Sequence, residues 1–104
     1  MHWGINALCV LMIAEENHES FAAVNGPHVV SELLKVTEHG QIAEQAARTL
    51  SNFMVNHKSQ LQVALAGGPE SLVSVVWRCI RNDFVHFDDV VMEQACAALC
   101  NLTF

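Results

Sequence analysis

Cys96 and Cys100 are the residues whose spacing most resembles half of a metal site. They stand four residues apart, so a helix would place both thiols on one face. A tetrahedral zinc site needs more ligands, and neither a Cys-x-x-Cys motif nor a suitably paired histidine accompanies them. When the similar stretches 44–53 and 93–102 are aligned, Cys96 also matches Ala47, a predicted core position, and Cys100 matches Ser51. We therefore expect no metal, and interpret both cysteines as small residues at places where helices approach closely.

Hydrolytic chemistry would need a nucleophile, a base and an orienting group brought together. Serine, histidine and aspartate all occur, but no nucleophile elbow surrounds a serine. The glycines of Gly67-Gly68-Pro69 join two expected helices and follow no strand, so they do not form a phosphate loop. We expect no catalytic residue, no enzyme activity and no cofactor.

The composition indicates one small helical domain with an acidic surface. The chain has 104 residues, of which 52% are hydrophobic and 15% charged, which excludes a disordered tail. Its formal charge of −6 makes nucleic acid an unexpected partner, and it either favours a basic peptide or protein or only keeps an apolar chain soluble. No apolar run approaches the length of a membrane span. The cysteines are expected to be reduced and in apolar settings, which suits the cytosol or the nucleus.

One stretch of sequence occurs twice. Residues 44–53 read EQAARTLSNF and residues 93–102 read EQACAALCNL, so that Glu, Gln, the first Ala, Leu and Asn match in place. A shift of 42 residues also sets Leu8 on Leu50 and Pro27 on Pro69. The next pair of copies is separated by 49 residues, from 44 to 93, and the extra residues fall in an insertion at 82–89. Such a period indicates a repeat architecture.

Glycine, proline and apolar spacing divide each repeat into helices. Helices are expected at 3–15, 18–25, 27–37, 41–56, 58–66, 69–81 and 88–103. His18 and His57 are expected as polar residues where the short helices begin, and Gly26 as a left-handed residue that ends the first of them. Asp88 or Asp89 is expected to cap the last helix. The core is expected at Val30, Leu33, Leu34, Leu72, Val75 and Val76.

A helix written E-Q-A-A-x-x-L-x-N-L resembles the third helix of an armadillo repeat, and the resemblance covers essentially the whole chain. It implies an all-α, right-handed solenoid of three-helix repeats. Residues 1–17 would be the last helix of one repeat, 18–59 a complete repeat, and 60–104 a third repeat with the insertion. The resemblance also implies a module that binds an extended partner segment along its concave third-helix surface.

The residues that would contact the partner follow from the same resemblance. The Asn of the third helix typically holds the peptide backbone, because its amide both donates and accepts hydrogen bonds. Asn52 and Asn101 occupy that position, and the alternative is that they only cap or bridge neighbouring helices. The other positions on this face are Gln45, Arg48, Gln94, Ala97, Trp3, Asn6 and Val10.

The chain departs from the importin type of armadillo protein, which carries a Trp four residues before that Asn. Those positions hold Asn6, Arg48 and Ala97, so binding of nuclear-import cargo is not expected. Arg48 would repel a basic peptide locally and fork onto a partner carboxylate, or simply lie in solvent. In the insertion, Phe84 and Phe87 either anchor a partner or fold back over the helix near Trp77.

Both ends of the chain are apolar where a terminal repeat normally has a polar outer face, as Trp3, Ile5, Leu102 and Phe104 show. We expect either a fragment of a longer array or self-association through the solenoid ends, as a structural or assembly element. A complete protein that is stable alone is the remaining alternative.

Overall fold

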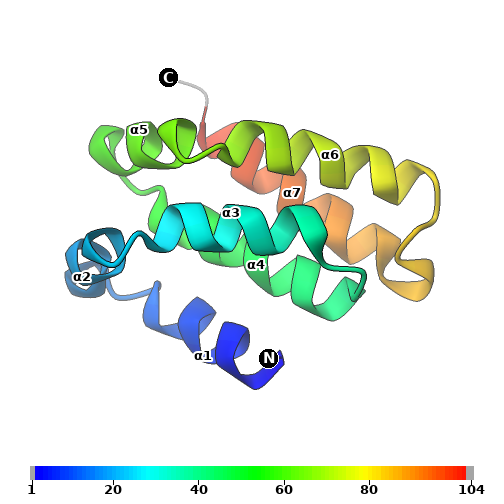
Figure 1. The fold of residues 1–104 in the computed structure, drawn as a ribbon, viewed down its shortest axis with the longest axis horizontal. Coiled ribbons are helices and arrows are strands. Elements are labelled where there is room, and N and C mark those ends of the chain that lie inside the picture. The colour runs from blue at the N-terminus through cyan, green and yellow to red at the C-terminus, as the bar shows by residue number, and fades with distance from the viewer. Residues whose placement is uncertain (1, 103–104) are drawn as a thin grey trace.

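The structure, a computed structural model, describes residues 2–102, except for the side chains of residues 2 and 3, and that part of the chain is all-helical with no strand. Figure 1 shows the helices in chain order. They are α1 (His2–Leu11), η1 (Glu15–Asn17), α2 (His18–Ala23), α3 (Gly26–Val36), α4 (Gly40–Phe53), α5 (His57–Leu65), α6 (Gly68–Ile80), η2 (Val85–Phe87) and α7 (Asp88–Asn101). We call α2–α4 the N-terminal triplet and α5–α7 the C-terminal triplet.

The α-helices begin within one residue of their predicted starts but end early. The largest differences are α1, which stops at Leu11 rather than at 15, and α4, which stops at Phe53 rather than at 56. Asn56 explains the second difference, because its side chain caps α5 by accepting a hydrogen bond from the backbone N–H of Ser59 at 2.9 Å. The division into repeats at residues 17 and 59 remains a prediction.

The turns before α3 and α6 have the same geometry and correct one prediction. The left-handed residue before α3 is Asn25 (φ 62°) rather than Gly26, and its counterpart before α6 is Gly67 (φ 85°). Gly26 is instead the first residue of α3, where an added Cβ would lie 2.4 Å from the ring of Phe21. Gly68 has the same role against Val63. Glycine is thus needed there for close helix approach.

The core lies between the triplets, with α4 at its centre. The α4 helix packs against α1 on one side and α7 on the other, and against α3 of its own triplet. The two longer helices that lead into α4 and α7 also pack together, α3 against α6. Of the predicted core residues, Val30, Leu34, Leu72 and Val75 are buried, while Leu33 and Val76 are only partly buried. The structure corrects the prediction of His18 as a polar residue at a helix start, because its side chain is only 7% exposed. Its ring lies 5.1 Å from that of Phe53.

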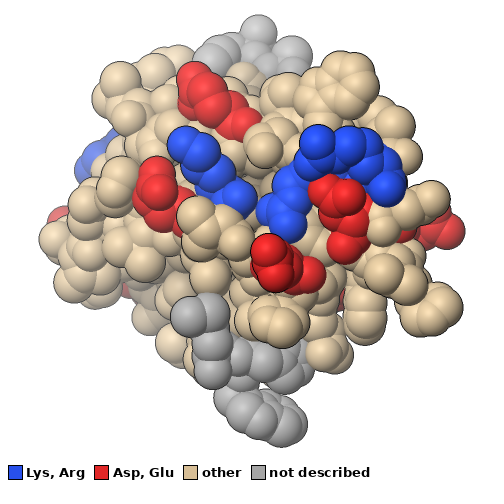
Figure 2. Space-filling view, turned by 45° about the vertical axis from the view of Figure 1, so that its right-hand side comes forward, with Lys and Arg blue, Asp and Glu red and all other residues tan. Residues whose placement is uncertain are grey.

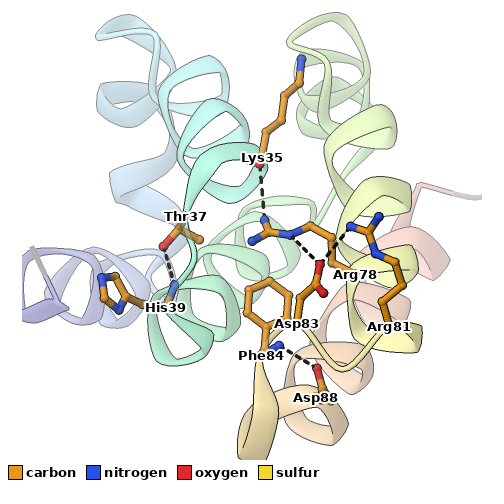
Figure 3. Close-up of polar contacts among 8 residues, drawn as sticks. All are labelled: Lys35, Thr37, His39, Arg78, Arg81, Asp83, Phe84 and Asp88. Carbon is orange, nitrogen blue, oxygen red and sulfur yellow. Dashed lines mark hydrogen bonds and ion pairs between the residues drawn. The ribbon is translucent and has the colours of Figure 1, made fainter.

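The insertion folds back onto α6 and α4, and for Phe84 this agrees with the second of the two interpretations from the sequence. The Phe84 side chain is 3% exposed and lies under the guanidinium of Arg78, 4.6 Å from its ring centroid (Figure 3). Phe87 lies against Gly40 at the start of α4 and remains partly exposed. Trp77 takes no part in this cover, since it is 62% exposed.

The prediction that Asp88 or Asp89 caps α7 is wrong. The α7 helix has no side-chain cap, and Asp88 is its first residue. The Asp88 carboxylate instead accepts a hydrogen bond from the backbone N–H of Phe84 at 3.0 Å, which closes the inserted loop (Figure 3). The negative charge of Asp88 still lies in the first turn of α7, where the helix dipole favours it.

Cys96 is a further correction to the predicted core. Its counterpart Ala47 is fully buried in α4, which packs against α1, α3 and α7, whereas Cys96 and Cys100 are exposed. Cys9 and Cys79 are buried, as expected for all four. Cysteines are therefore buried in α1 and α6 but exposed in α7, since no described helix covers the far side of α7.

Candidate functional site

The face predicted to bind a partner lies on α4, where Gln45, Arg48 and Asn52 share one side of the helix at spacings of three and four residues. All three are partly exposed, whereas the opposite side of α4 is buried. The matching residues of α7 are Gln94 and Asn101, both partly exposed, with the exposed Ala97 between them. Because α1, α4 and α7 pack in sequence, these faces belong to adjacent helices.

Arg48 is not a free charge on this face. Its guanidinium donates to the Glu44 carboxylate at 3.1 Å, one turn earlier in α4. The Gln45 amide nitrogen lies 3.5 Å from the same Glu44 oxygen, and the buried Gln45 Oε1 has no partner among the described residues. Neutralisation by Glu44 reduces the repulsion of a basic peptide that the sequence predicts at Arg48. The Glu–Arg spacing of four was a signal in the sequence that could have revealed this pair.

Asn52 and Asn101 make the same bond in successive helices. Asn52 Nδ2 donates to the backbone carbonyl of Cys9 at 3.3 Å, and Asn101 Nδ2 donates to the carbonyl of Ser51 at 3.1 Å. Cys9 and Ser51 are equivalent under the 42-residue shift. Each amide nitrogen therefore bridges neighbouring helices, the role that the sequence left as the alternative. No described residue donates a hydrogen bond to either Oδ1 atom, and neither oxygen is buried without a partner.

The N-terminal part of the predicted face is the least complete. Asn6 and Val10 lie on the exposed side of α1, Asn6 partly and Val10 59% exposed. The side chain of Trp3 lies outside the described part of the chain. Sequence reasoning missed Gln60 of α5, whose amide donates to the backbone carbonyl of Asn101 at 2.7 Å. No pattern within one helix could reveal a bond across 41 residues.

The thiol of Cys9 lies below this face and is held neutral. Burial raises its pKa above the usual value, while the nearby Arg48 guanidinium and a hydrogen bond with Thr49 lower it. The Cys9 sulfur also lies 3.7 Å from Asn52 Nδ2. Since a buried, protonated thiol is a weak nucleophile, Cys9 acts here as a packing residue.

The face is shallow. Four hollows on the described surface have volumes of about 390, 700, 340 and 650 Å³, and none is lined by Arg48, Asn52 or Asn101. The first and third follow one another between α2 and α5, sharing Ala22 and Gln62. A flat face with spaced amides suits an extended chain better than an enclosed small molecule.

Charged side chains of both signs are intermixed on the side of the molecule that lies to the right in Figure 1 (Figure 2). The Asp83 carboxylate forms two ion pairs, with the Arg81 guanidinium at 2.9 Å and with the Arg78 guanidinium at 3.8 Å. Arg78 also donates to the carbonyl of Lys35 at the end of α3, at 3.4 Å (Figure 3). These arginines tie the insertion to α3 and α6.

No group of three or more His, Cys, Asp or Glu side chains within residues 4–102 is placed to hold a metal ion. Among the described residues, no single helix is long and apolar enough to cross a membrane. The α5 and α6 helices have that length and apolarity only when they are taken together, and a bend of 72° separates them.

Comparison with protein-family models, with curated proteins and with solved structures finds no match for this chain.

Proposed function

We propose that this chain is a non-catalytic protein-interaction module of the armadillo type, which binds an extended partner segment across α1, α4 and α7. The observation that carries the proposal is the repeated position of Asn52 and Asn101, each bonded to the preceding helix in the same way. Two equivalent amides on adjacent helices suit the backbone of an extended peptide that crosses both helices.

Several features support the armadillo-type arrangement. The two triplets repeat a short helix and two longer ones, and the left-handed residues Asn25 and Gly67 hold equivalent positions. Equivalent helices pack on each other, α3 on α6 and α4 on α7. A solenoid of stacked repeats has contacts of this kind between neighbours.

The hydrogen bonds assign the chemistry of each Asn more narrowly than the resemblance does. Because Nδ2 of Asn52 and Asn101 already donates to a neighbouring helix, the partner would use Oδ1 as the acceptor for its backbone N–H. The Oε1 of Gln45 is buried, so a partner would contact Gln45 through its amide nitrogen. Arg48 and Gln94 would contact polar side chains of the partner.

Selection of peptides from a displayed random library on the intact chain, followed by affinity measurements, tests this function. Replacing both Asn52 and Asn101 with Ala should weaken the selected peptides by more than about 1 kcal/mol, or about fivefold, if two backbone contacts are lost. The matched control replaces His28 and Glu70 with Ala in the same way. Both are exposed residues at equivalent positions of α3 and α6. Circular dichroism must show that both double variants remain folded.

Selected peptides that lose affinity only with the Asn variant support the groove. Equal affinity for the Asn variant, or a library that yields no binding peptide, would overturn it.

A second candidate function, assembly through the ends, is favoured by the apolar surface at the far side of the C-terminal triplet. Val73, Trp77 and Ile80 are 47%, 62% and 60% exposed along one side of α6. Cys96 and Cys100 on α7 are exposed as well. Sedimentation over a concentration series separates the two functions, because dimers or longer arrays favour assembly and a monomer favours peptide binding.

A further inference from the structure

Two adjoining hollows form a groove between α2 and α5, at the end of the molecule that lies to the left in Figure 1. Their volumes are about 390 and 340 Å³, and Ala22 and Gln62 line both of them. One side of the groove belongs to the N-terminal triplet and the other to the C-terminal triplet. The groove therefore arises where the two triplets meet, and we call it the α2–α5 groove.

The larger hollow has carboxylates on one wall and a cation on the other. Glu15 of η1 and Glu19 of α2 line it on one side, and Lys58 of α5 lines it on the other. All three side chains are exposed, and none forms an ion pair with another described residue. The first turn of α5 adds partial positive charge, although the Asn56 side chain already accepts a hydrogen bond from the N–H of Ser59 there. Since two carboxylates face one ammonium, the hollow favours a cation.

His18 supplies a third acceptor in the wall of the same hollow. It is 7% exposed, and its Nε2 lies 2.7 Å from the carbonyl oxygen of Met12. Because a carbonyl oxygen only accepts, Nε2 carries the proton, and Nδ1 is the acceptor of the neutral ring. The buried Nδ1 has no partner among the described residues. A ligand that donates to it would remove the free-energy cost of an unpaired buried acceptor.

The three acceptors suit a guanidinium group. Glu15, His18 and Glu19 do not form a group placed to hold a metal ion. A guanidinium has five N–H donors in a planar fork, so it can serve several separate acceptors at once. The carboxylates are exposed and unpaired, so they can turn to admit it to Nδ1. The small side chains of Ala22 and Ala23 leave room for the apolar stem of an arginine.

The smaller hollow extends the groove beyond the length of one side chain. It is lined by the polar side chains of Asn25, His28 and Gln62 and by the apolar Pro27 and Leu65. Gln62 lies where the two hollows meet, and its amide can both donate to and accept from a peptide backbone. The groove therefore suits a peptide better than a single free cation.

We propose that the α2–α5 groove binds an arginine-containing peptide segment. The guanidinium would lie between Glu15, Glu19 and His18 Nδ1, and the peptide backbone beside it would follow Gln62 into the smaller hollow. Neither Asn52 nor Asn101 lines this groove, so the site is separate from the face on α1, α4 and α7.

The probe is a capped peptide of about five residues, with one central arginine between alanines. Nuclear magnetic resonance titration of the intact, isotopically labelled chain measures its affinity. Citrulline in place of the arginine keeps the shape of the side chain and removes its charge, so it should weaken binding about threefold or more. The nitrogen resonance of His18 Nδ1 is followed in the same titration and should shift when the atom accepts a hydrogen bond.

Single charge changes at exposed positions test the two walls. Glu19→Gln should weaken the arginine peptide about threefold, whereas Lys58→Gln should strengthen it about twofold. The matched control is Glu16→Gln, which removes the same charge from an exposed residue that does not line the groove. At an ionic strength of about 0.15 M this control should change the affinity by less than about 1.5-fold. Circular dichroism must show that all three variants remain folded.

A capped single arginine separates a peptide site from a site for a free cation. It should bind several-fold more weakly than the peptide, because it leaves the smaller hollow unfilled. The double replacement of Asn52 and Asn101 with Ala should leave the affinity for the arginine peptide unchanged, which separates this site from the proposed peptide-binding face.

Three results with the peptides would overturn the proposal: no binding of the arginine peptide, equal affinity for the citrulline peptide, or equal affinity for the capped single arginine. An unmoved His18 Nδ1 resonance at saturation would do the same. Among the variants, equal effects of Glu19→Gln and Glu16→Gln, weaker binding after Lys58→Gln, or loss of binding in the Asn double variant would each contradict it.

Discussion

Asn52 and Asn101 join neighbouring helices and still leave one atom of each amide without a donor among the described residues. Each donates Nδ2 to a carbonyl of the preceding helix, which fixes the amide plane and leaves Oδ1 for other donors. An amide held in this way loses little conformational entropy on binding. The alternatives that the sequence left open for these residues are therefore compatible, because they use different atoms of the same group.

The buried thiol of Cys79 should make stability fall in alkaline solution. Burial, with the Asp88 carboxylate as a smaller cause, raises its pKa from 9.0 to about 11. Between these values the unfolded chain has lost the proton that the folded chain retains, so the free energy of unfolding falls as the pH rises from 9 to 11. The contribution is fully present below pH 9 and amounts to about 3 kcal/mol at most. Urea unfolding at intervals across this range measures it.

Cys79→Ala provides the control for this pH dependence. The variant is less stable at every pH because a buried side chain is shortened, but its stability should fall less steeply above pH 9. An identical slope for both proteins would show that Cys79 titrates alike in the folded and unfolded chains.

At the scale of the helices, the starts of α3 and α6 depend on the absence of a side chain. An added Cβ at Gly26 would lie 2.4 Å from the Phe21 ring, and one at Gly68 would lie 2.3 Å from Val63 Cγ1 and 2.9 Å from its backbone oxygen. We expect Gly→Ala to destabilise the chain by about 1–3 kcal/mol at each position. Gly68 should be the more costly, because a backbone atom cannot move away as a ring can. Thermal or urea unfolding measures both.

Gly4→Ala is the matched control within α1. Nothing lies within 4 Å of the added Cβ, and alanine favours a helix, so this variant should gain about 0.5–1 kcal/mol. Equal effects of the three substitutions would mean that helix propensity, rather than close approach, governs these glycines.

The sequence predicts where helices start better than where they end, for a physical reason. Gly and Pro restrict the backbone locally, so Gly26-Pro27 and Gly68-Pro69 mark the starts of α3 and α6 within one residue. The end of α4 instead depends on competition with Asn56, which caps the next helix. Which of two adjacent residues becomes left-handed is equally hidden, since Asn25 and Gly26 both tolerate that conformation.

At the scale of the whole molecule, the sequence could not predict which equivalent residues are covered. Ala47 and Cys96 occupy the same position in their helices, yet Ala47 is fully buried and Cys96 is exposed. Phe84 and Phe87 read alike in the insertion, but Phe84 is buried beneath Arg78 and Phe87 is not. For the candidate site, the residues of the face follow from spacing within α4, whereas the bonds of Asn52 and Asn101 depend on helix stacking.

Stacking in sequence also predicts unequal stability along the chain. The central α4 contacts α1, α3 and α7, whereas α1 contacts mainly α4. We expect native-state hydrogen exchange of amides in the middle of α4 to require global unfolding, and that of α1 to need at least about 2 kcal/mol less. Ile5 is 5% exposed and anchors α1, so Ile5→Ala should lower protection in α1 and leave α7 nearly unchanged. Equal free energies and equal urea dependence of exchange in α1 and α4 would instead describe one cooperative unit.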